Sequence, residues 1–236
     1  MQAAGKLARI ASILRKSYGA RPPQRRWDNP LDSLIHTLLS QNTTAGNCER
    51  AYTQLRQRLR TWEAVWEAPL KDLMAAIRTG GLANIKAVHI KALLEEIWRE
   101  QGHFDLSFLR DVSDEEVRAY LGRFKGVGPK TTACVMLFGL GRAAFPVDTH
   151  VFRICRRLGL LNGQPTPEKA EAFLAPRLRT RDCHAFHLHL VEHGREVCTA
   201  HHPACDRCPL ADLCVYARRS TGSPQAARRP RSLVRT

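Results

Sequence analysis

Long apolar runs are missing from this sequence of 236 residues. Its longest apolar-rich stretch, residues 134–140, is far shorter than the ~18 residues that a membrane-spanning helix needs. The first residues also lack the continuous apolar core of a secretory signal. With 44% hydrophobic and 25% charged residues, the composition is that of a globular protein, which excludes collagen-like, low-complexity and wholly disordered chains.

Acidic residues are absent from both ends of the chain. Residues 1–27 contain seven Lys and Arg, and residues 218–236 contain six Arg, so the two ends carry nearly all of the net charge of +15. Basic chain ends commonly bind along a polyanion. Nucleic acid is the first candidate and an acidic membrane surface the second. A solubility role is the plain alternative, and an acid-free, Arg-rich start is also typical of a mitochondrial transit peptide.

The alternating pattern of a β-strand is absent as well, whereas apolar residues recur at helical spacing throughout. The sequence therefore predicts an all-α protein of about ten short helices. Asn29 followed by Pro30 is a typical helix start, and Ser113 with Glu116 has the spacing of a capping box. Residues 217–236 are expected to be disordered because they are almost without apolar side chains. Helices are expected near residues 7–18, 30–39, 44–59, 69–78, 85–100, 113–121, 129–138, 149–158, 167–174 and 185–193.

A glycine-rich turn joins two of these helices. Gly126, Val127 and Gly128 turn the chain, and Pro129 occupies the first position of the next helix. Glycine permits positive φ and close approach of another backbone, and the free N–H groups of a helix start bind phosphate oxygens. Val127 is expected to fill the space between the two helices. The string predicts a helix–hairpin–helix motif, which holds the DNA backbone without reading sequence; an ordinary tight turn is the alternative.

Two residues near this motif have the chemistry of a catalytic pair. Lys130 lies just inside the helix that follows the turn, and a Lys that gives up its proton is a nucleophile and forms Schiff bases. A simple phosphate contact would also explain it. Asp148 precedes another helix and can cap it. Its carboxylate can also accept a proton from Lys130 and offset positive charge that develops on a sugar.

Four of the eight cysteines lie within 17 residues, as Cys198-x6-Cys205-x2-Cys208-x5-Cys214. Zinc sites usually have two short-spaced pairs separated by a longer finger, whereas one compact loop of uneven spacing favours a cubic iron–sulfur cluster. Zinc stays open as the alternative, and disulfides are a more distant one. Nearby histidines are expected to be ordinary structural residues, and the scattered cysteines to lie in the core. These are His187, His189 and His193, and Cys48, Cys134, Cys155 and Cys183.

Taken together, these strings resemble the endonuclease III family of helix–hairpin–helix DNA glycosylases. The resemblance extends over residues 6–216 and includes Leu-Leu-Ser-Gln-Asn-Thr at 38–43, Gly-Leu-Ala-Asn-Ile-Lys-Ala at 81–87 and Val-Asp-Thr-His at 147–150. It implies two helical domains that bind duplex DNA between them. The implied boundaries are a helical barrel with the hairpin at 28–142, an iron–sulfur domain at 143–216 joined by a helix from 1–27, and a basic tail at 217–236. A transit peptide is then disfavoured, because residues 1–27 contain the first helix of the fold.

The resemblance also implies an activity. Members of the family excise damaged pyrimidines from duplex DNA after flipping the nucleotide out of the stack. Lys130 corresponds to the nucleophile, whose Schiff base allows elimination on the 3′ side, and Asp148 to the essential carboxylate. The cysteine loop corresponds to the ligands of a [4Fe–4S] cluster that orders a loop against phosphates. The implied DNA contacts are Gln41, Asn42, Leu82 as a wedge, Gly126, Val127, Gly128 and His150.

The implied partner is duplex DNA with a damaged base or an abasic site, bound by a monomer that is associated with the nucleoid in the cytoplasm and not with a membrane. The sequence departs from the family at Gln41-Asn42, where Ala-Gln is common, and at Ala45, where Asp is common. The string Thr-Thr-Ala-Gly at 43–46 is similar to the thymine-mismatch branch, which however has Tyr in place of Lys130. A shifted, mismatch-directed preference therefore stays open. The main alternative of another class is a non-catalytic iron–sulfur protein that binds DNA or senses lesions, and an electron carrier is a second.

Overall fold

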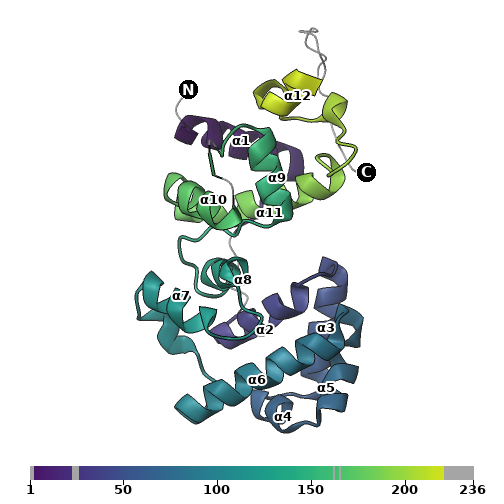
Figure 1. Cartoon of the computed structure of the whole chain (residues 1–236), viewed down its shortest axis with the longest axis vertical. Helices are drawn as coiled ribbons and strands as arrows, with labels where there is room; N and C mark the ends of the chain where they lie inside the picture. Colours follow the sequence, from purple (N-terminus) through teal and green to yellow (C-terminus); the bar gives the residue numbers. More distant parts are fainter. Residues whose placement is uncertain (1–2, 23–26, 162, 165, 221–236) are drawn as a thin grey trace. The chain divides into compact units, whose positions relative to one another are not determined.

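The computed structural model describes residues 3–22, 27–161, 163–164 and 166–220, and all regular elements in these ranges are helices (Figure 1). The all-α prediction is confirmed. The contacts divide the chain into two units, one formed by residues 25–141 and the other by residues 1–24 together with 142–236. None of the helices in the described ranges is long and apolar enough to cross a membrane.

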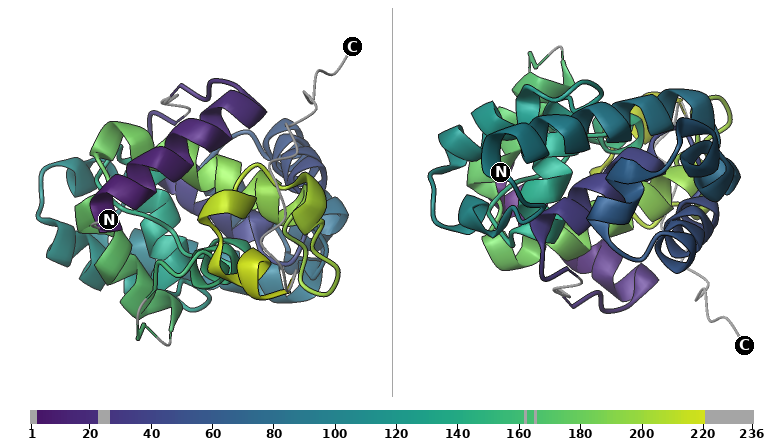
Figure 2. Two further views of the ribbon diagram at one scale, coloured as in Figure 1. Left: turned by 90° about the horizontal axis from the view of Figure 1, so that it is seen from above. Right: turned by 90° about the horizontal axis from the view of Figure 1, so that it is seen from below.

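The unit of residues 25–141 is built around α2. Most residues of this helix are buried, and it packs against α3, α6, α8 and a short π-helix at Val135–Gly139. The long α6 also packs along α5, as the right-hand view of Figure 2 shows. The α-helices of this unit are α2 (Pro30–Ser40), α3 (Ala45–Arg58), α4 (Trp62–Glu67), α5 (Leu70–Ile77), α6 (Ala83–Gln101), α7 (Asp114–Gly122) and α8 (Pro129–Cys134).

Local capping signals fix where these helices begin. The Asn29 side chain accepts a hydrogen bond of 2.9 Å from the backbone N–H of Leu31, and Pro30 occupies the first helical position. Ser113 and Glu116 form the reciprocal pair of a capping box at the start of α7. Both predicted helix starts are confirmed, since side-chain oxygens satisfy amides that have no partner within the helix.

The helix expected at 129–138 is interrupted. The α-helix α8 ends at Cys134, and the chain continues as the π-helix, in which the Leu140 N–H donates to the Val135 carbonyl at 3.0 Å. Gly139 lies directly against Ser33 of α2, because a Cβ built on Gly139 would be 2.8 Å from the Ser33 Cβ. The apolar pattern of the sequence does not distinguish an α-turn from the wider π-turn.

The second unit has α11 (Thr180–Glu196) at its centre. Both α1 (Ala3–Tyr18) and α9 (Thr149–Arg157) pack on it, and the left-hand view of Figure 2 shows α1 lying across it. Segments from both ends of the chain therefore build this unit. It also contains α10 (Pro167–Leu174) and α12 (Val215–Ser220).

Two predictions for this unit need correction. The helix expected at 185–193 is twice as long in the structure, as α11, and the disorder expected from residue 217 onward is wrong for residues 217–220. These belong to α12, in which Ala217 is buried. The rest of the expected tail, 221–236, lies outside the described residues. The prediction for the scattered cysteines of both units is confirmed, since all four are buried: Cys48, Cys134, Cys155 and Cys183.

Candidate functional site

The turn between α7 and α8 has the features of the predicted hairpin. Val127 is only 5% exposed, and Gly126 has a φ of +88°, in the region that favours glycine. A Cβ on Gly126 would lie 2.4 Å from Nδ1 of His89 in α6. Gly128 is different, because its φ of −93° suits any residue and nothing lies within 4 Å of the place where its Cβ would be. The fold needs a glycine at Gly126, whereas Gly128 leaves the outer side of the turn open.

Lys130 is the second residue of α8, directly after this turn. Its side chain is half-buried, while the next two residues, Thr131 and Thr132, are fully buried. Among the described residues of its own unit, no hydrogen bond or ion pair involves the Lys130 ammonium. The amine is therefore held on a packed helix start and is not engaged by a carboxylate of that unit.

Gln41, at the end of α2, is engaged with the hairpin. Its Nε2 donates to the Gly126 carbonyl at 3.0 Å and contacts Oγ1 of Thr131 at 3.1 Å. These bonds link two strings that lie far apart in the sequence and position the turn before Lys130. The implied DNA contact of Gln41 stays a prediction, and so does that of the next residue, Asn42, which is exposed and has a φ of +51°.

Leu82 protrudes at the start of α6. It adopts a left-handed conformation with a φ of +49° and is 47% exposed, although this conformation costs a non-glycine residue about 1–2 kcal/mol. An exposed leucine on a strained backbone suits the implied wedge into duplex DNA, which stays a prediction. Such wedges partly unstack base steps in complexes that bend DNA.

Lys86 holds the loop that precedes Leu82, and sequence reasoning missed this role. Its side chain is 4% exposed, and Nζ donates to the carbonyls of Leu39 at 2.7 Å and Gly80 at 2.9 Å. Burial lowers the pKa of Lys86. The only sequence signal was a Lys four positions after Leu82, on the face of α6 that also contains the apolar Ile90.

Asp148 caps α9 as predicted. Its Oδ1 accepts the backbone N–H of Val151 at 2.8 Å, and no hydrogen bond reaches its second oxygen from the described part of this unit. The cap fixes the carboxylate and leaves one oxygen available. His150 lies two residues after Asp148, and its Nδ1 contacts the guanidinium of Arg153, one helical turn further on, at 3.0 Å. His150 also packs against Gly194 of α11, where a Cβ would be 2.7 Å from its own; its DNA contact stays a prediction.

The four clustered cysteines lie on one loop between α11 and α12, with short 3₁₀ turns at Cys205–Arg207 and Ala211–Leu213. Burial, and to a smaller extent the nearby Cys198, Cys214 and Cys205, raise the pKa of the Cys208 thiol to about 12. In the described ranges, no three Cys, His, Asp or Glu side chains gather around one point as a single metal ion requires. The other three thiols of the loop are close enough to influence Cys208, and four thiols on one short loop are the ligand type of an iron–sulfur cluster.

Cationic and neutral donors surround this loop. Arg157 of α9 donates to Sγ of Cys198 at 3.3 Å and to the carbonyls of Thr199 at 2.6 Å and Ala200 at 2.8 Å. Nε2 of His193 lies 3.5 Å from Sγ of Cys208. Hydrogen bonds to ligand sulfurs are typical of iron–sulfur sites. Such donors suit the anionic sulfurs of a cluster.

The neighbouring histidines have structural partners. Nδ1 of His187 lies 2.9 Å from the Pro146 carbonyl, and Nε2 of His189 lies 3.0 Å from the Gly19 carbonyl. Nδ1 of His193 is 2.8 Å from the Tyr18 hydroxyl. All three side chains are buried, in agreement with ordinary structural histidines, and the expectation that they bind no metal stays a prediction.

From the geometry of the hairpin we expect different effects when each of its two glycines is replaced by alanine. Gly126→Ala should destabilise the protein by about 1–2 kcal/mol or more, because alanine disfavours the positive φ and its methyl group meets His89. Gly128→Ala should leave the melting temperature unchanged and weaken DNA binding, since the methyl group would project only toward a ligand. Thermal melting and duplex binding of both variants check this; the assignment is wrong if Gly128→Ala binds like wild type.

A second prediction concerns Arg157. Arg157→Met removes the donors to Cys198 and to the loop carbonyls, so iron should be lost to a chelator about tenfold faster or more, as a charge-assisted bond is worth about 1.5–3 kcal/mol. Arg156→Met is the matched control, because Arg156 makes no such bonds and should lose iron at the wild-type rate. The measurement is iron per chain against time; equal rates for both variants would contradict this role of Arg157.

Comparison with known proteins agrees with this geometry. The family model for the HhH-GPD superfamily of base excision DNA repair proteins matches residues 35–179, and that for the iron–sulfur binding domain of endonuclease III matches residues 198–214. The second match covers all four clustered cysteines, so the cofactor is a [4Fe–4S] cluster. Its ligands on this chain would be the four thiolates of the loop.

Individual relatives and solved structures point the same way. An Arabidopsis thaliana protein named as a DNA glycosylase is 48% identical over 132 residues, which are 56% of this chain but only 45% of that protein. Endonuclease III of Sulfolobus acidocaldarius is 31% identical over 190 residues, covering 80% of this chain and 82% of that one. A solved structure of a trapped covalent intermediate of endonuclease III with DNA has a TM-score of 0.77 at 26% identity, covering 94% of this chain and all of the other. The chain belongs to the endonuclease III family of helix–hairpin–helix base excision DNA glycosylases.

Proposed function

We propose that this protein is a DNA glycosylase with an associated abasic-site lyase activity that removes oxidised pyrimidines from duplex DNA through a Schiff base on Lys130. The observation that carries the proposal is the position of Lys130, on the first turn of α8 directly after the hairpin. Its amine has no carboxylate or hydrogen-bond partner in the described part of its unit. A free amine beside a backbone-binding turn is suited to attack a sugar.

The proposed reaction needs no external reductant or oxidant. The unprotonated Nζ of Lys130 attacks C1′ of the flipped nucleotide, the N-glycosidic bond breaks, and the departing base takes up a proton. Opening of the sugar ring gives an iminium ion between Nζ and C1′. Loss of a C2′ proton then expels the 3′ phosphate, and water finally hydrolyses the iminium to release Lys130.

Asp148 is proposed to assist the amine. A carboxylate can act as a general base that takes the proton from the attacking ammonium, and it stabilises positive charge that develops on the sugar. The cap bond from Val151 engages one oxygen of Asp148 and fixes its orientation. The bound [4Fe–4S] cluster supplies structure to the cysteine loop and takes no part in these steps.

The end of α2 favours a second candidate, a glycosylase with a shifted, mismatch-directed preference. The Gln41 amide is engaged with the hairpin, so the exposed amide here is that of Asn42, which is one methylene shorter than the glutamine common in the family. A shorter side chain fills the space left by a flipped base differently. Activity on duplexes with thymine glycol, dihydrouracil, uracil or a T·G mismatch separates the two candidates.

The test of the chemistry is borohydride trapping. Lys130→Ala should abolish the trapped protein–DNA adduct while duplex binding persists, because the hairpin stays intact. Lys125→Ala is the matched control, since it removes an exposed neighbouring charge and should trap at the wild-type rate. Trapping by Lys130→Ala would refute the proposed nucleophile, and no trapping by wild type on any lesion or abasic site would favour the non-catalytic alternative.

The variant Asp148→Asn distinguishes the helix-capping role of Asp148 from the role of its negative charge. Asn caps helices about as well as Asp, so the melting temperature should hold. Single-turnover base release should fall about 10²–10⁴-fold, the usual effect of losing a positioned acid–base group. If release is unaffected, Asp148 is a helix cap only.

A further inference from the structure

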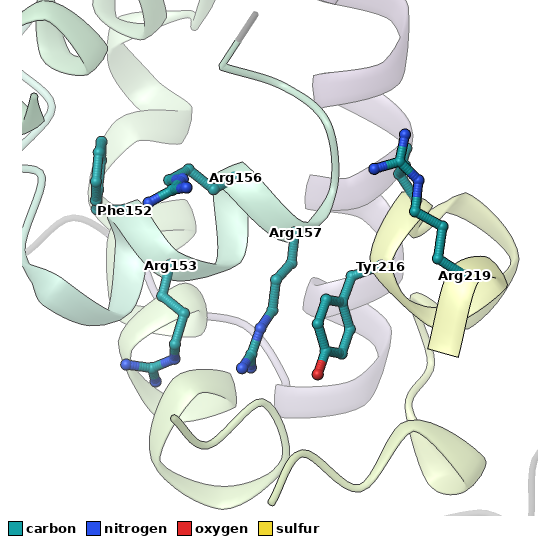
Figure 3. A pocket seen from close by; sticks show the side chains of 7 residues that line it. Phe152, Arg153, Arg156, Arg157, Tyr216 and Arg219 are labelled. Atoms are coloured by element: carbon teal, nitrogen blue, oxygen red, sulfur yellow. The ribbon is translucent and has the colours of Figure 1, made fainter. Parts of the chain in front are cut away.

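An arginine-rich pocket lies between α9 and α12, in the unit that contains the cysteine loop (Figure 3). Its volume is about 400 Å³. Two aromatic rings and four guanidinium groups line it together with one valine, and no Asp or Glu is among its lining residues. They are Phe152, Arg153, Arg156, Arg157, Val215, Tyr216 and Arg219.

Two of the four arginines have structural duties. Arg157 binds the cysteine loop as described above, and Arg153 donates to the carbonyls of Cys198 at 3.0 Å and Gly194 at 2.9 Å. The Arg157 guanidinium also stacks on the ring of Tyr216, with 4.6 Å between its central carbon and the ring centroid. Both guanidinium groups are therefore engaged by hydrogen bonds to the cysteine loop, and that of Arg153 also by one to α11.

The other two arginines lack such duties. Arg156 and Arg219 are exposed, and in the described part of the chain no hydrogen bond or ion pair involves the guanidinium group of either. The Arg156 guanidinium lies over the ring of Phe152, at 5.7 Å from its centroid. In the view of Figure 3, Arg156 and Arg219 lie on opposite sides of Arg157 and Tyr216.

We propose that this pocket binds phosphodiester groups of a DNA strand, through Arg156 and Arg219, as a contact additional to the hairpin. Arginine is always charged, and no carboxylate of the pocket balances the charges of Arg156 and Arg219. The ring of Phe152 beneath Arg156 restricts the orientation of this guanidinium for phosphate binding. Arg156 and Arg219 come from different helices and lie on opposite sides of Arg157 and Tyr216 in Figure 3, so each is assigned its own phosphate of one strand. The inference rests on the proposed function only for its choice of DNA as the anion.

The test uses the full-length protein with its cluster and an undamaged, labelled duplex. The pocket variant is Arg156→Gln with Arg219→Gln. The matched control is Arg9→Gln with Arg181→Gln, which removes the same charge from exposed positions of the same unit outside the pocket. The dissociation constant is measured over a series of salt concentrations. Each lost phosphate contact should lower the slope of log affinity against log salt by about 0.9.

We expect the pocket variant to lower this slope by about two units and the control to change it by less than half as much. Iron content and melting temperature should equal those of wild type, and the single variants should each lower the slope by about one unit. Equal slopes for wild type and pocket variant, or equal losses in variant and control, would overturn the proposal. Calorimetric binding of inorganic phosphate or dAMP that is lost in the pocket variant while the DNA slope is unchanged would assign a small anion and also overturn it.

Borohydride trapping keeps this proposal separate from the proposed function. The pocket variant should trap an abasic site at the wild-type rate when DNA is saturating, because neither arginine is assigned to the chemistry. If the wild type itself fails to trap, the glycosylase–lyase mechanism fails while the comparison of salt slopes keeps its meaning. A slope change without a trapping change is the result that supports the pocket as a second contact.

Discussion

The end of α2 is the point on which the candidate site in the unit of residues 25–141 depends. The last carbonyls of a helix have no partner within it, and burying them unpaired is costly. Lys86 satisfies the carbonyl of Leu39 and also that of Gly80, next to the loop that carries Leu82. Gln41, which follows α2, satisfies the carbonyl of Gly126. The end of α2, the loop before Leu82 and the hairpin are thus joined by the hydrogen bonds of Lys86 and Gln41.

Local signals made much of the fold predictable. Caps at Asn29 and Ser113 and the apolar periodicity depend on neighbours in sequence, and the structure confirms them. The bond from Lys86 to the Leu39 carbonyl could not be predicted, because it joins residues 47 positions apart. At the π-turn of Val135–Gly139 the chain lies directly against Ser33 of another helix, a contact that the local pattern does not contain. Likewise α12 buries Ala217, which composition alone does not reveal.

The cysteine loop likewise combines a signal that is local in the sequence with contacts from distant residues. The spacing of four cysteines within 17 residues was enough to predict them as a ligand set and to favour an iron–sulfur cluster over zinc. Its support comes from α9 and α11, where Arg157, Arg153 and His193 contact the ligands or the loop backbone. The arginines of α9 therefore divide into Arg153 and Arg157, which hold this loop, and Arg156, whose guanidinium makes no hydrogen bond in the described part of the chain.

The proposed chemistry depends on the amine of Lys130 as the group that joins the DNA. Peptide mapping by mass spectrometry of the wild-type protein, after borohydride reduction on a duplex with an oxidised pyrimidine, tests this directly. We expect one adduct, on Nζ of Lys130, within the peptide that follows the hairpin. An adduct on another lysine or on the N-terminal amine would contradict it.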